Sequence, residues 1–413
     1  MSEQNTPTER PEPTDDAGST GSPPAPEEAT SPPAGGRKTW QTVVAVVAVA
    51  ALAGTAGLLI GRGGTAEADA DTPGSGAGQA GAVDGDTVVA DTVSQSFAEG
   101  EHRGLDSVHQ GGDEDIENVL VSTDWLAEQI GSGLEENNIV LVDVSEQLAS
   151  SELTPYVDGH IPGAQFLDWA TSFTQDNTRE FIDADQFTEV SQGLGLDEDS
   201  TLVLYGDNNN WFAAYAAWVF NLYGFEDVRL LDGGLHKWEQ VDGRELVQEV
   251  PQPEPGTWVA QPQNFDIRAF QPEVLDAVDT GSHTLIDIRS TEEYNGEVGV
   301  DPAIFGGEST VIWGHIPGAI NVPWGSIVNE DGTYRSAEEI RAVYEEAGVD
   351  LDGPIITYCR IGERSSHTWF ALSQILGLDV QNYDGSWTEW GNTVGVPVTN
   401  ETGDRGGVWG TSR

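Results

Sequence analysis

The hydrophobic pattern between residues 118 and 400 alternates short apolar runs with longer segments of helical character. One run, Pro354–Tyr358, is β-branched and aromatic, as expected of a buried strand. The segment Ser366–Gly377 that follows predicts a helix with Ser365 or Ser366 as its N-cap and Gly377 as its stop. Repeated alternation of strands and helices predicts α/β domains whose sheets are mainly parallel.

The same pattern occurs twice, because three motifs of the first half recur in the second. The matching pairs are Gly159–Ala164 with Gly314–Ala319, Leu141–Ser145 with Leu285–Arg289, and Leu231–Gly234 with Tyr383–Ser386. Each copy spans about 130 residues, an ordinary domain size. We therefore expect two similar domains in tandem.

The composition divides the chain into seven predicted parts. They are a disordered acidic and Pro-rich tail at 1–39, a membrane anchor or signal sequence at 40–61, a flexible acidic linker at 62–117, a first domain at 118–245, an interdomain linker at 246–264, a second domain at 265–400 and a C-terminal tail at 401–413. The tail and the acidic linker have too few large apolar residues to bury a core.

An apolar segment near the N-terminus has the length of a membrane span. Residues 43–60 carry no charge, and as a helix they would be roughly 27 Å long, close to the ~30 Å hydrocarbon core of a bilayer. A cleaved signal peptide, with Ala66, Ala68 and Ala70 near the cleavage site, is the alternative. The long polar tail before the segment favours a retained single-pass anchor.

The flanking charges predict the orientation of this anchor. Arg37 and Lys38 precede the apolar segment, whereas Arg62 alone follows it. Positive residues stay on the cytoplasmic side, so we expect a cell-membrane protein whose two domains at 118–400 are extracytoplasmic.

The charge of the chain is extremely acidic. Its 70 Asp and Glu against 17 Lys and Arg give a net charge of −53. Phosphate binding needs clustered cations, which excludes nucleic acid as a partner. Self-repulsion of this size destabilises a compact state unless salt screens it, so we expect a halophilic source and a fold that needs high salt.

Cys359 is the only cysteine, and it lies directly after the predicted strand Pro354–Tyr358. Arg360 and Arg364 follow it closely, and nearby cations lower the pKa of a thiol. Loop N–H groups at the start of the next helix can converge on an anion there, and Gly362 permits the backbone that this requires. A buried structural cysteine is the alternative. Glu363 is unusual beside an anion site; an outward orientation that pairs it with an arginine is one option, and the sequence leaves it open.

The loop Cys359–Ser366 resembles the active loop of rhodanese-type thiosulfate sulfurtransferases, and the tandem repeat extends this resemblance over residues 118–400. The resemblance implies that the catalytic Cys359 takes the outer sulfur of thiosulfate, releases sulfite and passes the sulfur of its persulfide to cyanide or a thiol. No general base is needed if the thiol is already ionised. The implied substrate-binding residues are Arg360, Gly362, Arg364, Ser365 and Ser366.

The spacing Cys-x4-Arg from Cys359 to Arg364 distinguishes this loop from two related ones. Tyrosine-phosphatase-like loops have Cys-x5-Arg, and a tighter loop favours a sulfur over an oxyanion. Mercaptopyruvate sulfurtransferases usually have small neutral loop residues, whereas two arginines favour a small dianion such as thiosulfate.

The two halves differ at the loop position. Cys359 precedes Asp384 by 25 residues, and the same count back from Asp232 reaches Asp207, where thiol and arginine are both missing. The resemblance therefore implies an inactive first domain that shields the site. Trp211 or Trp218 of that domain is a candidate wall of the cleft, with core packing as the alternative.

Other candidates lie in the second half. Arg289 ends a strand, where α/β proteins gather ligand-binding residues, and either binds the anion or pairs with Asp287 or Glu292. Trp387 either lines the cleft or packs in the core. Many thiosulfate sulfurtransferases have an arginine at the position of Glu293, so one expected substrate contact is missing, which leaves the sulfur donor open.

Cofactors and partners follow from the motifs that are present. The seven histidines show no metal-binding spacing, and there is no P-loop or dinucleotide-binding glycine turn, so we expect no metal and no cofactor. The expected partners are thiosulfate and a thiol or cyanide acceptor, with a protein acceptor as a further option. Two alternatives stay open: a sulfur-carrier or sensory module without turnover, and a phosphatase or arsenate reductase, whose loop would be one residue longer.

Overall fold

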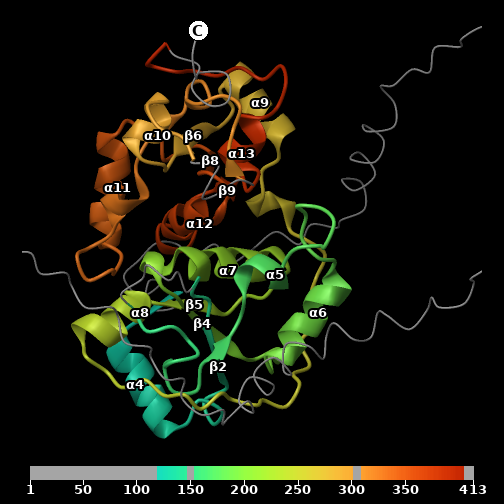
Figure 1. Ribbon diagram of the computed structural model, residues 1–413, viewed down its shortest axis with the longest axis vertical. Helices are drawn as coiled ribbons and strands as arrows, with labels where there is room; N and C mark the ends of the chain where they lie inside the picture. Colours follow the sequence, from blue (N-terminus) through green and yellow to red (C-terminus); the bar gives the residue numbers. More distant parts are fainter. Residues whose placement is uncertain (1–118, 147–152, 301–307, 404–413) are drawn as a thin grey trace, which may run out of the picture. The chain divides into compact units, whose positions relative to one another are not determined.

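The computed structural model describes residues 119–146, 153–300 and 308–403, all within one compact unit, Gly85–Arg413 (Figure 1). The predicted acidic tail, the apolar segment at 43–60 and the whole linker at 62–117 lie outside the described residues. Among the described residues, no helix combines the length and apolar character needed to cross a bilayer.

The first domain is built on a five-stranded sheet in the order β1-β5-β4-β2-β3, with every neighbouring pair parallel. Its strands are β1 (Leu120–Val121), β2 (Ile139–Asp143), β3 (Gln165–Phe166), β4 (Thr201–Tyr205) and β5 (Val228–Leu231). Its helices are α4 (Thr123–Ser132), α5 (Trp169–Ser172), α6 (Ala184–Gly193), the 3-10 turn η1 (Asn208–Asn210), α7 (Trp211–Leu222), α8 (Gly234–His236) and the π-helical η2 (Lys237–Val241).

The second domain has a four-stranded parallel sheet in the order β7-β6-β8-β9. Its strands are β6 (Thr284–Asp287), β7 (Ile320–Asn321), β8 (Ile355–Tyr358) and β9 (Val380–Asn382). Its helical segments are η3 (Phe265–Ile267), α9 (Gln271–Thr280), α10 (Thr291–Asn295), η5 (Trp324–Ile327), α11 (Ala337–Glu346), α12 (Glu363–Trp369), the π-helical η6 (Phe370–Ile375) and α13 (Ser386–Trp390). The α/β class with parallel sheets is confirmed, as is the strand expected within Pro354–Tyr358.

Both sheets are buried on both faces, which explains why their strands read as nearly continuous apolar runs. In β2, Leu141 packs in the cluster that contains Leu126 of α4, whereas its neighbour Val142 packs in the cluster that contains α7. In the second sheet, Ile356 packs with Val274 of α9, on the face away from α12. Alternate residues therefore serve two separate hydrophobic layers.

Helices α7 and α12 lie side by side between the two sheets, and both are almost entirely buried (Figure 1). Helix α7 is apolar around its circumference because one side covers the first sheet and another packs on the second domain. Trp218 of α7 is fully buried and donates from Nε1 to the carbonyl of Ile267, 3.0 Å away. The two domains therefore share one hydrophobic core.

Helix α12 begins earlier than the sequence predicted. Gly362, with φ +97°, is its N-cap, and Ser365 and Ser366 lie inside the helix. The serine N-cap prediction is wrong because tertiary contacts fix a glycine there. A Cβ at Gly362 would lie 2.6 Å from the Asp384 Cα, so both the backbone conformation and the close approach require glycine. Gly377, with φ +66°, follows the end of the helical segment as expected.

Candidate functional site

Cys359 directly follows β8 and is completely buried. Its sulfur accepts a hydrogen bond from the Gly362 N–H at 3.1 Å, and its own N–H donates to the Ser386 Oγ at 3.1 Å. The thiol donates in turn to Oε2 of Glu363, 3.5 Å from the sulfur. The orientation of Glu363, which the sequence left open, is inward: the side chain is only 3% exposed, its carboxylate faces the thiol, and it also lies 3.9 Å from both Arg360 and Arg364.

The thiol is not held in its ionised form. The pKa of Cys359 lies above its ordinary value, first because burial removes the thiolate from water and second because the Glu363 carboxylate repels it. Arg364 and hydrogen bonds from Ser365 act in the opposite direction without prevailing. The condition under which no general base is needed, an already ionised thiol, is therefore not met, and removal of the thiol proton becomes part of the chemistry.

Both loop arginines are paired with carboxylates. Arg364 donates from Nη1 and Nη2 to Glu293 at 3.2 and 3.4 Å, and its Nε lies 3.9 Å from Glu363. Arg360 lies 2.5 Å from Glu308 through Nε and 3.9 Å from Glu363 through Nη2. Two guanidinium groups thus face three carboxylates, and a thiosulfate dianion has to compete with those carboxylates for them.

Glu293 pairs with Arg364, a role that the sequence did not suggest, since there it marked only a missing substrate contact. Burial by itself would raise its pKa, but Arg364 reverses this effect and holds the pKa below the ordinary value. Glu293 therefore remains ionised and neutralises the arginine beside the thiol.

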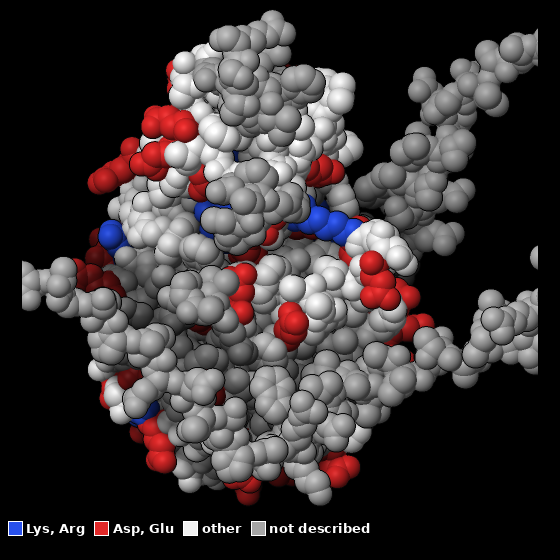
Figure 2. All heavy atoms as spheres, viewed as in Figure 1, with Lys and Arg blue, Asp and Glu red and all other residues white. Residues whose placement is uncertain are grey.

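In Figure 2 the visible red acidic side chains are scattered over both domains, whereas the largest group of blue Lys and Arg atoms lies in the band between them.

The two serines after the loop fix its backbone. The hydroxyls of Ser365 and Ser366 donate to the Gly362 carbonyl at 3.0 and 2.9 Å, and the Asn382 Nδ2 donates to the same oxygen at 3.1 Å. Their predicted contact with substrate is thus replaced in this structure by contacts with the loop itself. Asn382 was missed by the sequence analysis, although its place at the end of β9 is where α/β sheets carry functional residues.

Ser386 was also missed, although the repeat contained a signal for it. The motif Leu231–Gly234 ends in glycine, whereas its copy ends in Ser386, which adopts a positive φ of +52°, close to the +54° of Gly234. A serine in this conformation is strained. Its hydroxyl donates to the carbonyl of Tyr383 at 2.6 Å and accepts the N–H of Cys359, which fixes the start of the loop.

Arg289 and Trp387 lie behind the loop. Arg289 is buried and forms a bidentate ion pair with Asp287, with Nη2 2.5 Å from Oδ2. Of the predicted alternatives, the structure shows this ion pair and leaves the guanidinium no access to a soluble anion. The Trp387 ring lies 4.7 Å from the same guanidinium, and the backbone N–H of Trp387 donates to the Cys359 carbonyl at 3.1 Å. Trp387 therefore packs in the core.

The loop of the first domain that corresponds to the cysteine loop has a different structure. Asp207 is buried, and its Oδ1 accepts the N–H of Glu146 at 3.0 Å. The three residues Asn208–Asn210 all have positive φ, between 49° and 61°. Asparagine tolerates this conformation better than other side chains do. This loop carries neither a thiol nor a guanidinium group.

Trp211 and Trp218 of α7 have different positions. The Trp211 ring packs edge-on against Trp324 of the second domain, with centroids 4.8 Å apart, and lies 5.8 Å from the Arg364 guanidinium. It therefore reaches the edge of the site, in agreement with the predicted wall. Trp218 is a core residue, as the alternative predicted.

Comparison with known proteins identifies two copies of one domain. The rhodanese-like domain family matches residues 123–241 and 270–393. A putative thiosulfate sulfurtransferase of Saccharopolyspora erythraea is 50% identical over 69% of this chain and 97% of that protein. The sulfur carrier protein TtuD of Thermus thermophilus is 47% identical over 68% of this chain and 96% of its own length.

A solved structure shares the fold. SseA from Escherichia coli, described as a 3-mercaptopyruvate sulfotransferase with the rhodanese fold, is 30% identical with a TM-score of 0.55. The match covers 65% of this chain and 98% of SseA. The residue limits of the seven parts expected from the sequence stay predictions. The family matches show that the chain belongs to the rhodanese family, with two rhodanese-like domains in tandem.

Proposed function

We propose that this protein is a thiosulfate sulfurtransferase that transfers a sulfane sulfur to a thiophilic acceptor, such as cyanide or a thiol, through a persulfide on Cys359. The observation that carries the proposal is the buried Cys359 sulfur, which lies at a helix start and accepts the Gly362 N–H at 3.1 Å. Such a donor stabilises an anionic sulfur. The relative from Saccharopolyspora erythraea, named as a putative thiosulfate sulfurtransferase, supports this choice.

The first half-reaction begins with a proton transfer. Glu363 accepts the thiol proton from Cys359, since its Oε2 lies 3.5 Å from the sulfur. The thiolate then attacks the outer sulfur of thiosulfate, the sulfur–sulfur bond of thiosulfate breaks, and sulfite leaves with the electron pair. The product is a persulfide on Cys359, whose terminal sulfur carries the negative charge.

The second half-reaction regenerates the enzyme. Cyanide attacks the terminal sulfur of the persulfide and leaves as thiocyanate, and the electron pair of the broken sulfur–sulfur bond returns to the Cys359 thiolate. The thiolate then takes its proton back from Glu363. The Gly362 N–H stabilises the anionic sulfur in both halves, as electrostatic catalysis requires.

Arg360 is the better candidate of the two arginines for the thiosulfate dianion. Its side chain is 22% exposed, against 9% for Arg364. Its partner Glu308 is half-buried, and burial raises the pKa of that carboxyl group. Protonation of Glu308 therefore frees Arg360 for the anion more readily than protonation of Glu293 frees Arg364, because the pKa of Glu293 is lowered.

Thiocyanate formation tests the proposal. The full chain, in molar KCl, is given thiosulfate and cyanide beside the variant Cys359→Ser. We expect thiocyanate from the native chain only, and an added sulfur on Cys359 by mass spectrometry after thiosulfate alone. A folded native protein that forms neither product would exclude thiosulfate as the donor.

A sulfur-carrier role is the second candidate, because the Thermus thermophilus relative is named a sulfur carrier protein. A carrier would form the persulfide with thiosulfate and deliver it to a protein partner. Rapid loss of the added sulfur to cyanide and small thiols favours the enzyme. Persistence of the persulfide with every small acceptor, and rapid loss to one protein, favours the carrier.

We also propose that residues 43–60 anchor the protein in the membrane with both domains on the extracytoplasmic side, and that the source is halophilic. The uncharged segment and the net charge of −53 support these two proposals. Release of the full chain from membranes by a carbonate wash would exclude the anchor. Resistance of both domains to protease added to intact cells would indicate the opposite orientation. Equal unfolding midpoints in about 0.1 M and about 2 M KCl would exclude the salt requirement.

A further inference from the structure

The peptide unit between Ile361 and Gly362 connects the reactive sulfur with the first domain. Its N–H donates to the Cys359 sulfur at 3.1 Å. Its carbonyl, on Ile361, accepts from Nη2 of Arg179 at 2.6 Å. Arg179 belongs to the first domain, 182 residues earlier in the chain.

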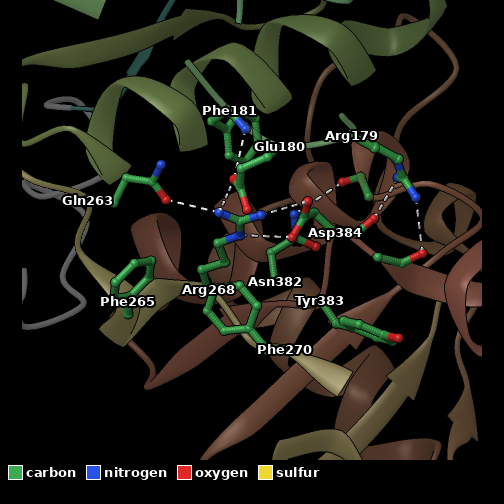
Figure 3. Close-up of polar contacts among 12 residues, drawn as sticks. Arg179, Glu180, Phe181, Gln263, Phe265, Arg268, Phe270, Asn382, Tyr383 and Asp384 are labelled. Atoms are coloured by element: carbon green, nitrogen blue, oxygen red, sulfur yellow. Dashed lines mark hydrogen bonds and ion pairs between the residues drawn. The ribbon is translucent and has the colours of Figure 1, made fainter. Parts of the chain in front are cut away.

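One guanidinium group thereby spans both loops that form the site. Besides Ile361, Arg179 donates to the carbonyls of Asp384 at 2.8 Å and of Gly385 at 3.4 Å (Figure 3). Asp384 and Gly385 precede α13, so Arg179 connects the cysteine loop with the segment that follows β9. The fork of donors on arginine suits this bridging, because one planar group offers five N–H donors.

Arg179 is placed by its own segment of the first domain. The segment between α5 and α6 turns back on itself, with an antiparallel bridge between Thr174 and Phe181. The next residue, Glu180, accepts from Arg268 Nη1 at 2.7 Å, and Arg268 also pairs with Asp384 (Figure 3). The turn is therefore fixed on the second domain by contacts of Arg179 itself and of Glu180, the residue that follows it.

The second domain has the equivalent turn without an arginine on a loop carbonyl. Its bridge joins Val328 and Tyr334, and the Tyr334 N–H donates to Oδ1 of Asp232 at 2.9 Å. Asp331 in this turn pairs with Lys237 at 2.7 Å. Each turn thus contacts the other domain. Of the two, only the turn of the first domain places a cation on the loop that carries the thiol.

The geometry of a peptide gives this contact a consequence for the sulfur. In a trans peptide the carbonyl and the N–H point in opposite directions. An Ile361 carbonyl held toward Arg179 therefore directs the Gly362 N–H at the Cys359 sulfur. The charge of the guanidinium also polarises the unit, which strengthens the N–H as a donor to an anion.

We propose that Arg179 of the first domain is a positioning residue that orients the Ile361–Gly362 peptide and so stabilises the anionic sulfur of Cys359. The inference rests on the proposed function in taking Cys359 as the reacting group. It gives the first domain a part in the chemistry, although its own loop has Asp207 in place of a cysteine.

The thiol titration tests this role without any sulfur donor. Cys359 is the only cysteine, so a full chain with isotope-labelled cysteine Cβ gives one NMR resonance that follows the ionisation. In Arg179→Met we expect titration at higher pH, with the thiolate fraction about tenfold lower at a fixed pH below the midpoint. In Arg179→Lys one ammonium group replaces the fork, and we expect an intermediate titration.

Arg229→Met is the matched control, because Arg229 also belongs to the first domain but pairs with Asp227 and contacts no residue of the loop. Its titration should equal that of the native chain. Native titration in a folded Arg179→Met overturns the inference, and if that variant does not fold, native titration in Arg179→Lys does so. Failure of the proposed function is separate, since it appears as absence of thiocyanate from the native chain.

Discussion

Replacement of Arg268 by methionine should destabilise the joint between the two domains. Arg268 is 4% exposed, and its Nε and Nη1 lie 3.0 Å from Asp384 and 2.7 Å from Glu180. Nη1 also donates to Gln263 at 2.9 Å, and the Phe181 ring lies 4.7 Å from the guanidinium (Figure 3). Methionine keeps much of the apolar stem but removes every one of these polar contacts.

The size of the effect depends on which carboxylates lose their partner. The Asp384 side chain is only 12% exposed and would be left as an uncompensated buried charge, whereas Glu180 is 41% exposed and can be hydrated. Breaking a buried ion pair on one side costs about 3–5 kcal/mol. Since Glu180 adds little, we expect Arg268→Met to lower the free energy of unfolding by about 3 kcal/mol.

Urea unfolding of the full chain in molar KCl measures this loss. Arg229→Met is the control, because its ion pair with Asp227 is partly exposed and should contribute about 0.2–1 kcal/mol. Adding Asp384→Asn to Arg268→Met should recover part of the loss, because the uncompensated charge is gone. A loss for Arg268→Met no larger than that for Arg229→Met would refute the reasoning.

Four further predictions concern ionisable groups. Glu363→Gln should lower the pKa of the Cys359 thiol, since it removes a carboxylate 3.5 Å from the sulfur, and an unchanged NMR titration would contradict this coupling. In Glu363→Gln the carboxylate that accepts the thiol proton is gone, and burial still opposes ionisation of the thiol, so persulfide formation from thiosulfate by this variant should accelerate from neutral to alkaline pH; a flat rate profile would contradict the role of Glu363 as the base. Burial raises the pKa of Asp143 from 3.8 to about 6. Between these two pH values the folded state holds a proton that the unfolded state has released, so the free energy of unfolding falls by about 3 kcal/mol as the pH rises from 3.8 to about 6. Asp143→Asn should remove that fall in urea unfolding, whereas Asp287→Asn should cost about 3–5 kcal/mol because it breaks the buried pair with Arg289.

The contrast between Asp143 and Asp287 shows what a repeat can and cannot predict. Both aspartates end a buried strand of a recurring motif, and the strand positions were readable from the sequence. Two residues later one copy has Ser145 and the other Arg289, which pairs with its aspartate in the structure. The sequence left this pair open as one of two alternatives, because a strand-end arginine is equally suited to bind a ligand.

The sequence by itself determined the fold class, the tandem organisation and the position of Cys359 at a strand end. These features are local, because strands of a parallel sheet need continuous apolar runs. The motif around the cysteine is contiguous in the chain, so its spacing was fully visible.

Only the tertiary structure decided the electrostatics of the site. Glu293 lies 71 residues from Arg364, and Arg179 lies 182 residues from Ile361, yet each pair is in hydrogen-bond contact. The pKa of Cys359 depends first on its burial, which only folding produces, and then on Glu363 and Arg364, whose side chains folding orients toward or away from the sulfur. The sequence showed two cations beside a thiol, whereas folding brought the carboxylates that neutralise them and the arginine of another domain that orients the loop.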